Sequence, residues 1–377
     1  MMKNTIGPIL LKAQDKQLLM LRKSAQVIDT YASQLAELYM IKHPELIRVV
    51  PLEREGVIKQ YIAKAGPLDQ QGTWAYLPWQ NSAIHLLPEK DFLAVRTNRN
   101  ANIITPDEQK KFYDCVVGVA GLSVGGSIAL TLALEGGARR IRIADFDRLE
   151  LSNTNRILAG VHELDTPKTT IIARRIWEIN PYAQVEIFDQ GLNEGNIAQF
   201  MKGLDVVVDE MDSMAIKQLI REYARDHKIA LVSTADNGDS SEVDVERHDQ
   251  KRTPLFLGKL GKTSVEKFKG MNKIQVIQEI TRLLGPENVP PRMQASVPLI
   301  GSSLVSVPQL GGTALMGAAA TAYCIRRIAA GQPLPSGRTI ISLDEKLEPG
   351  YATAKARAKR AKDTKAFAKR YGMEYNR

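Results

Sequence analysis

Four polar side chains of the types that handle a triphosphate lie in one stretch of the sequence. Asn153 and Arg156 share a polar segment, Lys168 follows a Thr-Pro pair, and Asp212 ends a later polar segment. An arginine and a lysine at one nucleotide would neutralise the charge that develops on a leaving pyrophosphate. A carboxylate beside them would suit Mg²⁺ bridged to the phosphates. These residue types indicate chemistry on a triphosphate. The alternative is that the arginine and the lysine are surface cations that cap helices.

An α/β domain is predicted to position these side chains. Buried strands are predicted at 116–119, 140–145 and 205–209, and the turn GLSVGG follows the first of them. Glycines let a backbone approach a phosphate, and the N-terminus of the next helix offers free N–H groups. We therefore expect Gly121 and Gly125 to bind the phosphates of the nucleotide.

Acidic residues are predicted at the same edge of the sheet. Asp145 ends the second strand, the position at which an acid holds ribose hydroxyls in dinucleotide-binding folds. The later strand VVVD delivers Asp209, Glu210 and Asp212 to the carboxyl edge, where open α/β sheets bind their ligands. Acids at this edge commonly hold Mg²⁺.

The rest of the chain is predicted as additions to a domain at 96–347. Residues 1–95 combine helical apolar spacing with a strand or hairpin at 72–88, which predicts a mainly helical addition. Residues 348–377 are predicted to form a basic tail, helical or disordered. Nine Lys or Arg against two Asp or Glu from residue 351 onward account for most of the net charge of +9. Because the charge belongs to a tail, we do not expect nucleic acid as a partner.

Composition narrows the class of protein further. The chain has 377 residues, of which 44% are hydrophobic and 25% charged, as in ordinary soluble enzymes. No apolar run approaches the roughly 20 residues of a membrane span. The two cysteines, Cys115 and Cys324, lie in apolar stretches and form no CxxC motif. We therefore expect a cytoplasmic protein without a zinc ribbon, a disulfide framework or a membrane partner.

The segment DFDRLELSNTNR resembles the signature D-x-D-x-[VI]-x-x-S-N-x-x-R of the ThiF/MoeB family, whose domain also forms the adenylation core of ubiquitin-activating enzymes. The resemblance covers roughly residues 96–249. It implies an α/β fold with a Rossmann-like sheet and helices on both faces. It also implies an ATP site with the following residues: Asp145 at the ribose, Asp147 beside it, Asn153, Arg156 and Lys168 at the phosphates, and Asp212 at Mg²⁺.

A second segment, RTNRN, is similar to the R-x-x-R segment of the same family. In that family the second arginine reaches a nucleotide phosphate, often across a homodimer interface. The resemblance therefore implies a homodimer in which Arg99 acts at the phosphates, in its own subunit or in the partner.

Two features depart from the family pattern. Only Gly125 of the usual glycine turn stays in register, and neither Cys115 nor Cys324 is placed like the catalytic cysteine of sulfur-transferring members. Cysteines for zinc are missing as well. We therefore expect adenylation without thioester transfer or sulfur relay.

Some ThiF-like enzymes without a transfer cysteine modify ribosomally made peptides, as in microcin C- and pantocin-type biosynthesis. The resemblance implies an adenylyltransferase that activates a carboxylate, with adenylation favoured over phosphorylation. Arg99, Arg156, Lys168 and Asp212 would carry the catalysis. Alternatives are activation of the C-terminus of a ubiquitin-like or sulfur-carrier protein, a non-catalytic nucleotide-binding scaffold, and an NAD(P)-dependent oxidoreductase.

Overall fold

The computed structural model describes residues 7–373 and divides them into two compact units. The N-terminal unit holds the residues up to Lys110 together with the short segments Ala133–Gly136 and Ala173–Ala183. The sheet unit holds Lys111–Leu132, Gly137–Ile172 and the residues from Gln184 onward. The division of the chain at residues 95 and 347 stays a prediction.

Within the described residues, the sheet unit is built on a seven-stranded sheet in the order β11-β10-β9-β8-β5-β6-β7. Its strands are β5 (Val116–Ala120), β6 (Arg140–Ala144), β7 (Gln184–Phe188), β8 (Val206–Asp209), β9 (Ala230–Asn237), β10 (Ser240–Glu246) and β11 (Gly337–Ser342). Strands β5 to β9 pair in parallel, and β10 and β11 continue the sheet antiparallel. The strands predicted from the apolar runs are confirmed.

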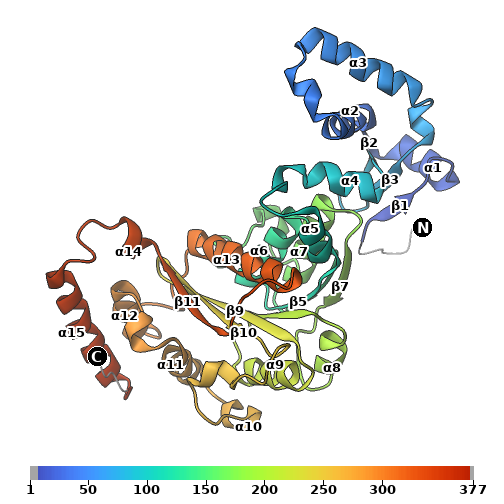
Figure 1. The fold of residues 1–377 in the computed structure, drawn as a ribbon. Coiled ribbons are helices and arrows are strands. Elements are labelled where there is room, and N and C mark those ends of the chain that lie inside the picture. The colour runs from blue at the N-terminus through green and yellow to red at the C-terminus, as the bar shows by residue number, and fades with distance from the viewer. Residues whose placement is uncertain (1–6, 374–377) are drawn as a thin grey trace. The chain divides into compact units, whose positions relative to one another are not determined.

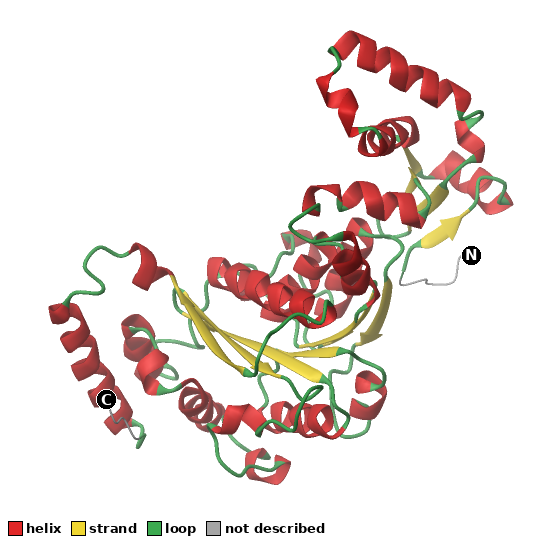
Figure 2. Cartoon of the chain, viewed as in Figure 1, coloured by secondary structure: helices red, strands yellow, loops and turns green. Residues whose placement is uncertain are grey.

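Helices cover both faces of this sheet, so the predicted Rossmann-like α/β fold is confirmed (Figures 1 and 2). The helices α6 (Val124–Leu134) and α13 (Gly311–Ala329) lie on one face. The helices α8 (Ile197–Met201), α9 (Met214–Asp226) and α11 (Lys273–Leu284) lie on the other. Further helices are α5 (Pro106–Asp114), α7 (Lys168–Ile179), α10 (Val265–Phe268), α12 (Pro291–Ser296), α14 (Leu343–Leu347) and α15 (Ala354–Arg370).

The strand order sets the place of a binding site. Every residue of β5 is buried, and Val119 pairs with Ile143 of β6 on one side and Val208 of β8 on the other. Connections from β5 run first towards β6 and then return to β8, so the order of strands reverses between β5 and β8. Ligands of open α/β sheets bind beyond the carboxyl ends of the strands at such a reversal.

The N-terminal unit contains a four-stranded sheet in the order β1-β3-β4-β2. Its elements are β1 (Ile9–Leu11), α1 (Lys16–Ser24), β2 (Gln26–Asp29), α2 (Tyr31–Lys42), α3 (Pro51–Lys64), β3 (Thr73–Leu77), β4 (Ser82–Leu86) and α4 (Glu89–Arg96). The hairpin β3–β4 and the helices are confirmed. The prediction of a mainly helical addition missed β1 and β2, because strands of three and four residues are specified by pairing with β3 and β4 instead of by their own pattern.

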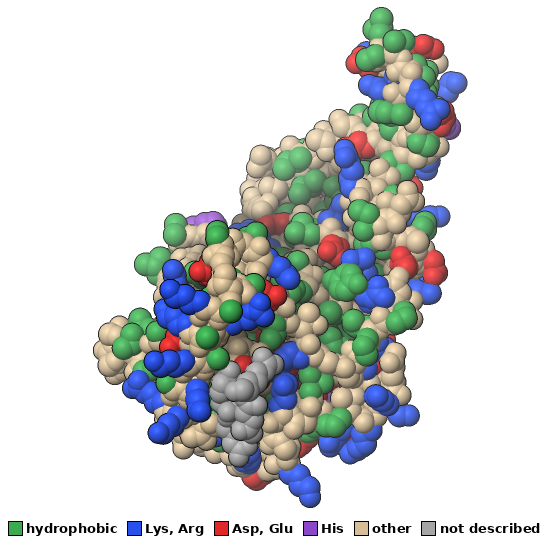
Figure 3. All heavy atoms as spheres, turned by 60° about the vertical axis from the view of Figure 1, so that its left-hand side comes forward, with side chains coloured by type: hydrophobic (Ala, Val, Ile, Leu, Met, Phe, Trp, Pro, Cys, Tyr) green, Lys and Arg blue, Asp and Glu red, His purple; other side chains and the backbone are tan. Residues whose placement is uncertain are grey.

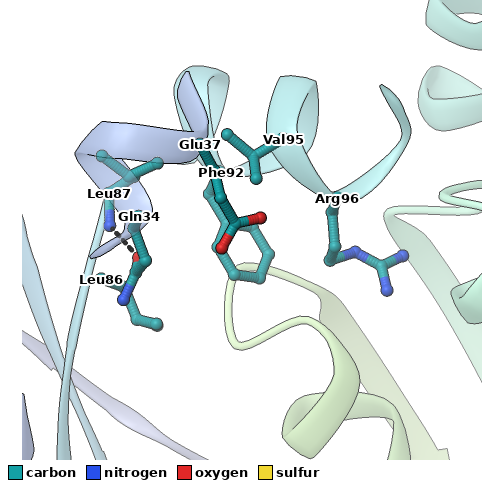
Figure 4. Close-up of a pocket in the computed structure, with 7 residues that line it drawn as sticks. All are labelled: Gln34, Glu37, Leu86, Leu87, Phe92, Val95 and Arg96. Carbon is teal, nitrogen blue, oxygen red and sulfur yellow. Dashed lines mark hydrogen bonds between the residues drawn. The ribbon is translucent and has the colours of Figure 1, made fainter. Parts of the chain in front are cut away.

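A cavity of about 310 Å³ lies in the N-terminal unit (Figure 4). It is lined by Gln34, Glu37, Leu86, Leu87, Phe92, Val95 and Arg96. The side-chain oxygen of Gln34 accepts the backbone N–H of Leu87 at 3.0 Å, which fixes α2 against the end of β4. The guanidinium of Arg96 points away from the other lining side chains and donates to the carbonyl of Ala133. Arg96 is thus engaged by the backbone of its own unit.

The basic segment near the C-terminus folds as α15 and packs through a short apolar stretch. Phe367 is 6% exposed and contacts a cluster that includes Val289 and Met293. The side chain of Gln294 donates to Thr364 Oγ1 at 2.9 Å. The Lys and Arg side chains of α15 point outward, on the face that Figure 3 shows.

At the edge of the seven-stranded sheet, one arginine forms ion pairs with two buried acids. Arg338 on β11 lies 2.8 Å from Glu242 and 2.6 Å from Asp244, both on β10. Burial raises the pKa of Glu242 to about 8, although the charge of Arg338 opposes that shift. A single guanidinium therefore does not keep both carboxyl groups ionised.

This arrangement predicts a stability that depends on pH. The pKa of Glu242 is raised from 4.5, so the folded protein binds this proton more tightly than the unfolded chain. The stabilisation is complete below about pH 4.5 and is lost as the pH rises through about 8. In urea denaturation, Glu242→Gln should lose less free energy of unfolding between pH 5 and 8.5 than the wild type. The exposed control Glu348→Gln should follow the wild type, and equal slopes for all three proteins would contradict the prediction.

Candidate nucleotide-binding site

The glycine turn after β5 is shaped by its contact with the end of β8. Gly121 has φ +87°, and a Cβ at this position would lie 2.4 Å from the carbonyl oxygen of Glu210. Gly125 opens α6 so closely to the sheet that a Cβ would lie 2.9 Å from Val119. Only glycine suits the first position, because both its conformation and its surroundings exclude a side chain. The predicted contacts of Gly121 and Gly125 with phosphate stay predictions.

Asp145 at the end of β6 holds this turn in place. Its two carboxylate oxygens accept the backbone N–H of Leu122 at 2.7 Å and that of Asp147 at 2.8 Å. Burial raises the pKa of Asp145, and these hydrogen bonds and the charge of Lys168 oppose the shift. Asp145 therefore organises the turn in the protein itself, and its predicted contact with a ribose stays a prediction.

Lys168 begins α7 and lies inside the site. Its side chain is 7% exposed, and its Nζ lies 2.8 Å from Asp147 Oδ2, whose side chain is 47% exposed. The backbone N–H of Lys168 donates to the carbonyl of Asp147 as well. Lys168 is thus a buried cation fixed beside Asp147, which argues against the alternative of a surface lysine that caps a helix.

The signature segment positions Arg156 over the glycine turn. Asn153 is buried and accepts the N–H of Glu150 at 3.1 Å, which closes the short helix that precedes Arg156. Arg156 Nε donates to Ser123 Oγ at 2.9 Å, and its Nη1 donates to Asn155 Oδ1 at 2.9 Å. The arginine is therefore held from both sides before any ligand binds.

Two carboxylates lie within electrostatic reach of Arg156. Burial lowers the pKa of its guanidinium, and Asp212 and then Asp236 oppose that shift. The structure therefore brings together Ser123, Arg156, Asp212 and Asp236 at the carboxyl edge of the sheet. Of these, sequence analysis named Arg156 and Asp212.

The three acids that follow β8 have different surroundings. Asp209 is fully buried and pairs with Arg221 and with Lys217, the latter at 3.4 Å. Glu210 accepts the N–H of Thr234 at 2.7 Å, and burial raises its pKa well above the ordinary value, which favours the uncharged form. Asp209 and Glu210 are therefore poorly suited to hold a metal ion, and the predicted metal role of Asp212 stays a prediction.

Asp212 alone among these acids is exposed and free to meet a cation. Within residues 7–373, no group of three or more His, Cys, Asp or Glu side chains is arranged to hold a metal ion. Mg²⁺ needs no such cage, because it is usually bound through one or two carboxylates together with the phosphates of a substrate. A single carboxylate beside a predicted phosphate site therefore fits Mg²⁺.

Sequence analysis did not assign Asp236 to the site. The sequence around it is polar and is typical of a loop, whereas in the structure β9 continues to Asn237 and carries Asp236 to the carboxyl edge. Both carboxylate oxygens of Asp236 are buried, and neither has a hydrogen-bond partner among the described residues. Burial raises its pKa to about 6 against the opposing charge of Arg156. The signal in the sequence was an acid shortly after a buried strand of the sheet.

Arg99 lies in the N-terminal unit, on the short helical turn Asn98–Asn100, and is exposed. The other predicted site residues belong to the sheet unit. The role of Arg99 at a phosphate, within a subunit or across a dimer, stays a prediction.

Both cysteines are buried. Burial raises the pKa of Cys115 to about 12 and that of Cys324 to about 11. A thiol that remains protonated at neutral pH is a poor nucleophile.

No helix in the described part of the chain has the length and apolar character to cross a membrane.

The fold and the site define a nucleotide-binding α/β protein of Rossmann-like type. The model of the ThiF family matches residues 97–301, and the chain belongs to this family. This confirms the resemblance carried by the signature segment.

Several known proteins are similar to parts of the chain. A protein of Mycobacterium tuberculosis named Uncharacterized protein MT1398 is 38% identical over 283 residues, 74% of this chain and 39% of that protein. The tRNA threonylcarbamoyladenosine dehydratase of Escherichia coli is 34% identical over 126 residues, 33% of this chain and 46% of that protein. The sulfur carrier protein ThiS adenylyltransferase of E. coli is 30% identical over 133 residues, 35% of this chain and 53% of that protein. The chain thus spans about half or less of the length of these relatives.

Among solved structures, that of E. coli MccB with ATP is 18% identical and covers 69% of this chain and 77% of that chain, with a TM-score of 0.49.

Proposed function

We propose that this chain uses ATP and Mg²⁺ to activate a carboxylate by adenylation. The observation that carries the proposal is the placement of Arg156, bonded to Ser123 of the glycine turn and within reach of the exposed carboxylate of Asp212. Membership of the ThiF family supports it, as do relatives that are named adenylyltransferases. In the proposed reaction a carboxylate oxygen attacks the α-phosphate and pyrophosphate leaves.

The residues of the chain would act by position and charge. Arg156 and Lys168 would stabilise the negative charge on the leaving pyrophosphate, and Asp145 would hold the ribose. Asp212 would hold Mg²⁺, which neutralises charge on the phosphates. A carboxylate is already ionised at neutral pH, so its attack needs no general base. The remaining proposed contacts to the nucleotide are those of Gly121, Gly125, Asp147, Asn153 and Arg99.

The proposed substrate is the carboxylate of a ribosomally made peptide in natural-product biosynthesis, activated without a catalytic cysteine. The two thiols support this part of the proposal, because both are buried with raised pKa values. The proposed enzyme is a homodimer in which Arg99 contacts the phosphates of the nucleotide. The exposed side chain of Arg99 is consistent with this role.

A second candidate substrate is the C-terminus of a small sulfur-carrier protein. The 30% identity to the E. coli ThiS adenylyltransferase favours it. A small protein that ends in Gly-Gly would then stimulate ATP–pyrophosphate exchange more strongly than short peptides do.

The metal role of Asp212 gives a direct test. In Asp212→Asn, ATP–pyrophosphate exchange with a peptide pool should fall about 100-fold, because the carboxylate that holds Mg²⁺ beside the phosphates is lost. The Mg²⁺ concentration for half-maximal exchange should rise. Asp226→Asn, at the exposed end of α9, is the matched control and should behave like the wild type. Exchange by Asp212→Asn at the wild-type rate and Mg²⁺ dependence would remove Asp212 from the site, and nucleotide binding without turnover in the wild type would indicate a scaffold.

A further inference from the structure

Asp236 occupies a point where three segments of the sheet unit converge. It lies near the end of β9, opposite Ser241 of β10. The hydroxyl of Thr313, in the first turn of α13, donates to the carbonyl of Gly238 at 2.6 Å. The start of α13 also approaches the signature segment, since a Cβ on Gly311 would lie 2.5 Å from the carbonyl oxygen of Asn155.

The carboxylate of Asp236 is enclosed at this point without a donor. Both of its oxygens are buried and without a hydrogen-bond partner among the described residues. Arg156, the cation whose charge opposes the raised pKa of Asp236, donates hydrogen bonds to Ser123, Asn155 and the carbonyl of Ser152. Glu210, whose pKa the charge of Asp236 also raises, uses Oε1 to accept the N–H of Thr234. Arg156 therefore acts on Asp236 through its positive charge, but no described residue donates a hydrogen bond to either carboxylate oxygen.

Such an arrangement is costly unless a ligand completes it. A buried polar group that lacks a partner costs about 1–3 kcal/mol, and native proteins leave few such groups. A buried carboxylate without a hydrogen-bond partner among the described residues, at the carboxyl edge of the sheet, is therefore a candidate functional group. The triphosphate is not the missing partner, because phosphate oxygens are anionic acceptors and offer no donor.

We propose that Asp236 binds the nitrogen group that captures the activated acyl group and accepts its proton. The proposal rests on the adenylation proposed above and defines the second substrate as an amine or amide nitrogen. A nitrogen with two N–H bonds can donate to both open oxygens, whereas a hydroxyl offers one donor only. Asp236 is then a catalytic residue of the capture step, whereas Arg156 and Asp212 act on the nucleotide.

The capture step balances as an acyl transfer. The nitrogen lone pair attacks the carbonyl carbon of the acyl adenylate, a C–N bond forms, and the bond from that carbon to the phosphate oxygen of AMP breaks. AMP leaves with the electron pair. The nitrogen becomes acidic as the C–N bond forms, and its proton passes to Asp236. The raised pKa, about 6, keeps this carboxylate ionised at neutral pH and makes it a stronger base than an ordinary aspartate.

The test separates activation from capture in the full-length protein. Peptides ending in each of the twenty amino acids supply the carboxylate, and glycinamide serves as the nitrogen probe. ATP–pyrophosphate exchange reports activation, and glycinamide-dependent AMP release reports capture. In Asp236→Asn, exchange should stay within about threefold of the wild type while capture falls about 100-fold or more, the usual contribution of a general base.

The pH dependence distinguishes proton transfer from a structural role. Capture should fall in both proteins as the amine of glycinamide becomes protonated, but below about pH 6 wild-type capture should fall more steeply than the residual capture of Asp236→Asn, because Asp236 becomes protonated there as well. Asp226→Asn should keep both the rate and the pH profile. Equal losses of exchange and capture in Asp236→Asn would assign the residue to the nucleotide or to Mg²⁺, and unchanged capture would overturn the proposal outright. If the wild type shows no exchange with any peptide, the proposed adenylation itself fails and the capture step falls with it.

Discussion

Arg156→Ala is expected to lower ATP–pyrophosphate exchange by about 100- to 1,000-fold, which makes it the most damaging single change at the site. The guanidinium lies over the glycine turn, bonded to Ser123, and is the cation best placed to meet charge on the leaving pyrophosphate. Its fixed geometry in the free protein means that little rearrangement is needed when the nucleotide binds. Exchange kinetics, together with calorimetric titration of a non-hydrolysable ATP analogue, would measure the loss.

Two further variants make this prediction specific. Arg156→Lys should recover only part of the activity, because an ammonium cannot reproduce the two-sided hydrogen bonding of a guanidinium. Arg148→Ala removes an arginine from the same segment whose side chain is 58% exposed, and it should stay within about twofold of the wild type because exposed ion pairs contribute little. An Arg156→Ala enzyme with near-normal exchange would show that the phosphates bind elsewhere.

The second large effect is expected on stability, at Arg221. This arginine is 1% exposed and pairs with Asp209 and with Glu246, the latter at 2.8 Å, and its guanidinium lies 4.3 Å from the ring centre of Phe256. Arg221→Met would remove the guanidinium that pairs with two fully buried carboxylates. Removing one member of such a network costs about 3–5 kcal/mol, so the free energy of unfolding in urea should fall by that amount.

Two comparisons identify the cause of that loss. Arg225→Met lies one turn further along α9, in an ion pair with Asp226, and should cost less than about 1 kcal/mol. In the Arg221→Met background, Asp209→Asn should recover part of the lost stability, because the uncompensated charge is removed. A double variant less stable than Arg221→Met would indicate that packing against Phe256, and not charge, explains the loss.

The sequence predicts the centre of the sheet well because the central parallel strands are buried on both faces. Strands such as Val116–Ala120 and Val206–Asp209 appear as continuous apolar runs, which few other structures produce. The strand Ile9–Leu11 is apolar but only three residues long, and Gln26–Asp29 contains two polar residues. They exist because distant segments pair with them, and a pairing partner is not visible in a local pattern.

The site was predictable in its residue types but not in their partners. The signature segment located Arg156, and the family resemblance located Lys168, but only the structure shows that Lys168 is paired with Asp147 and that Asp145 holds the turn. Asp236 was not assigned to the site because the second half of β9 is polar, whereas both carboxylate oxygens of Asp236 are buried in the folded chain. Burial of this kind is a property of tertiary packing, and the sequence around Asp236 carries no sign of it.

The central claim is that a carboxylate oxygen attacks the α-phosphate of ATP, and isotope transfer tests it most directly. Peptides whose C-terminal carboxylates carry ¹⁸O, produced by proteolysis in H₂¹⁸O, would be incubated with the protein, ATP, Mg²⁺ and glycinamide. After the acyl group is captured, mass spectrometry of the products should find one ¹⁸O in AMP. The appearance of ¹⁸O in inorganic phosphate, or AMP without label, would contradict adenylation.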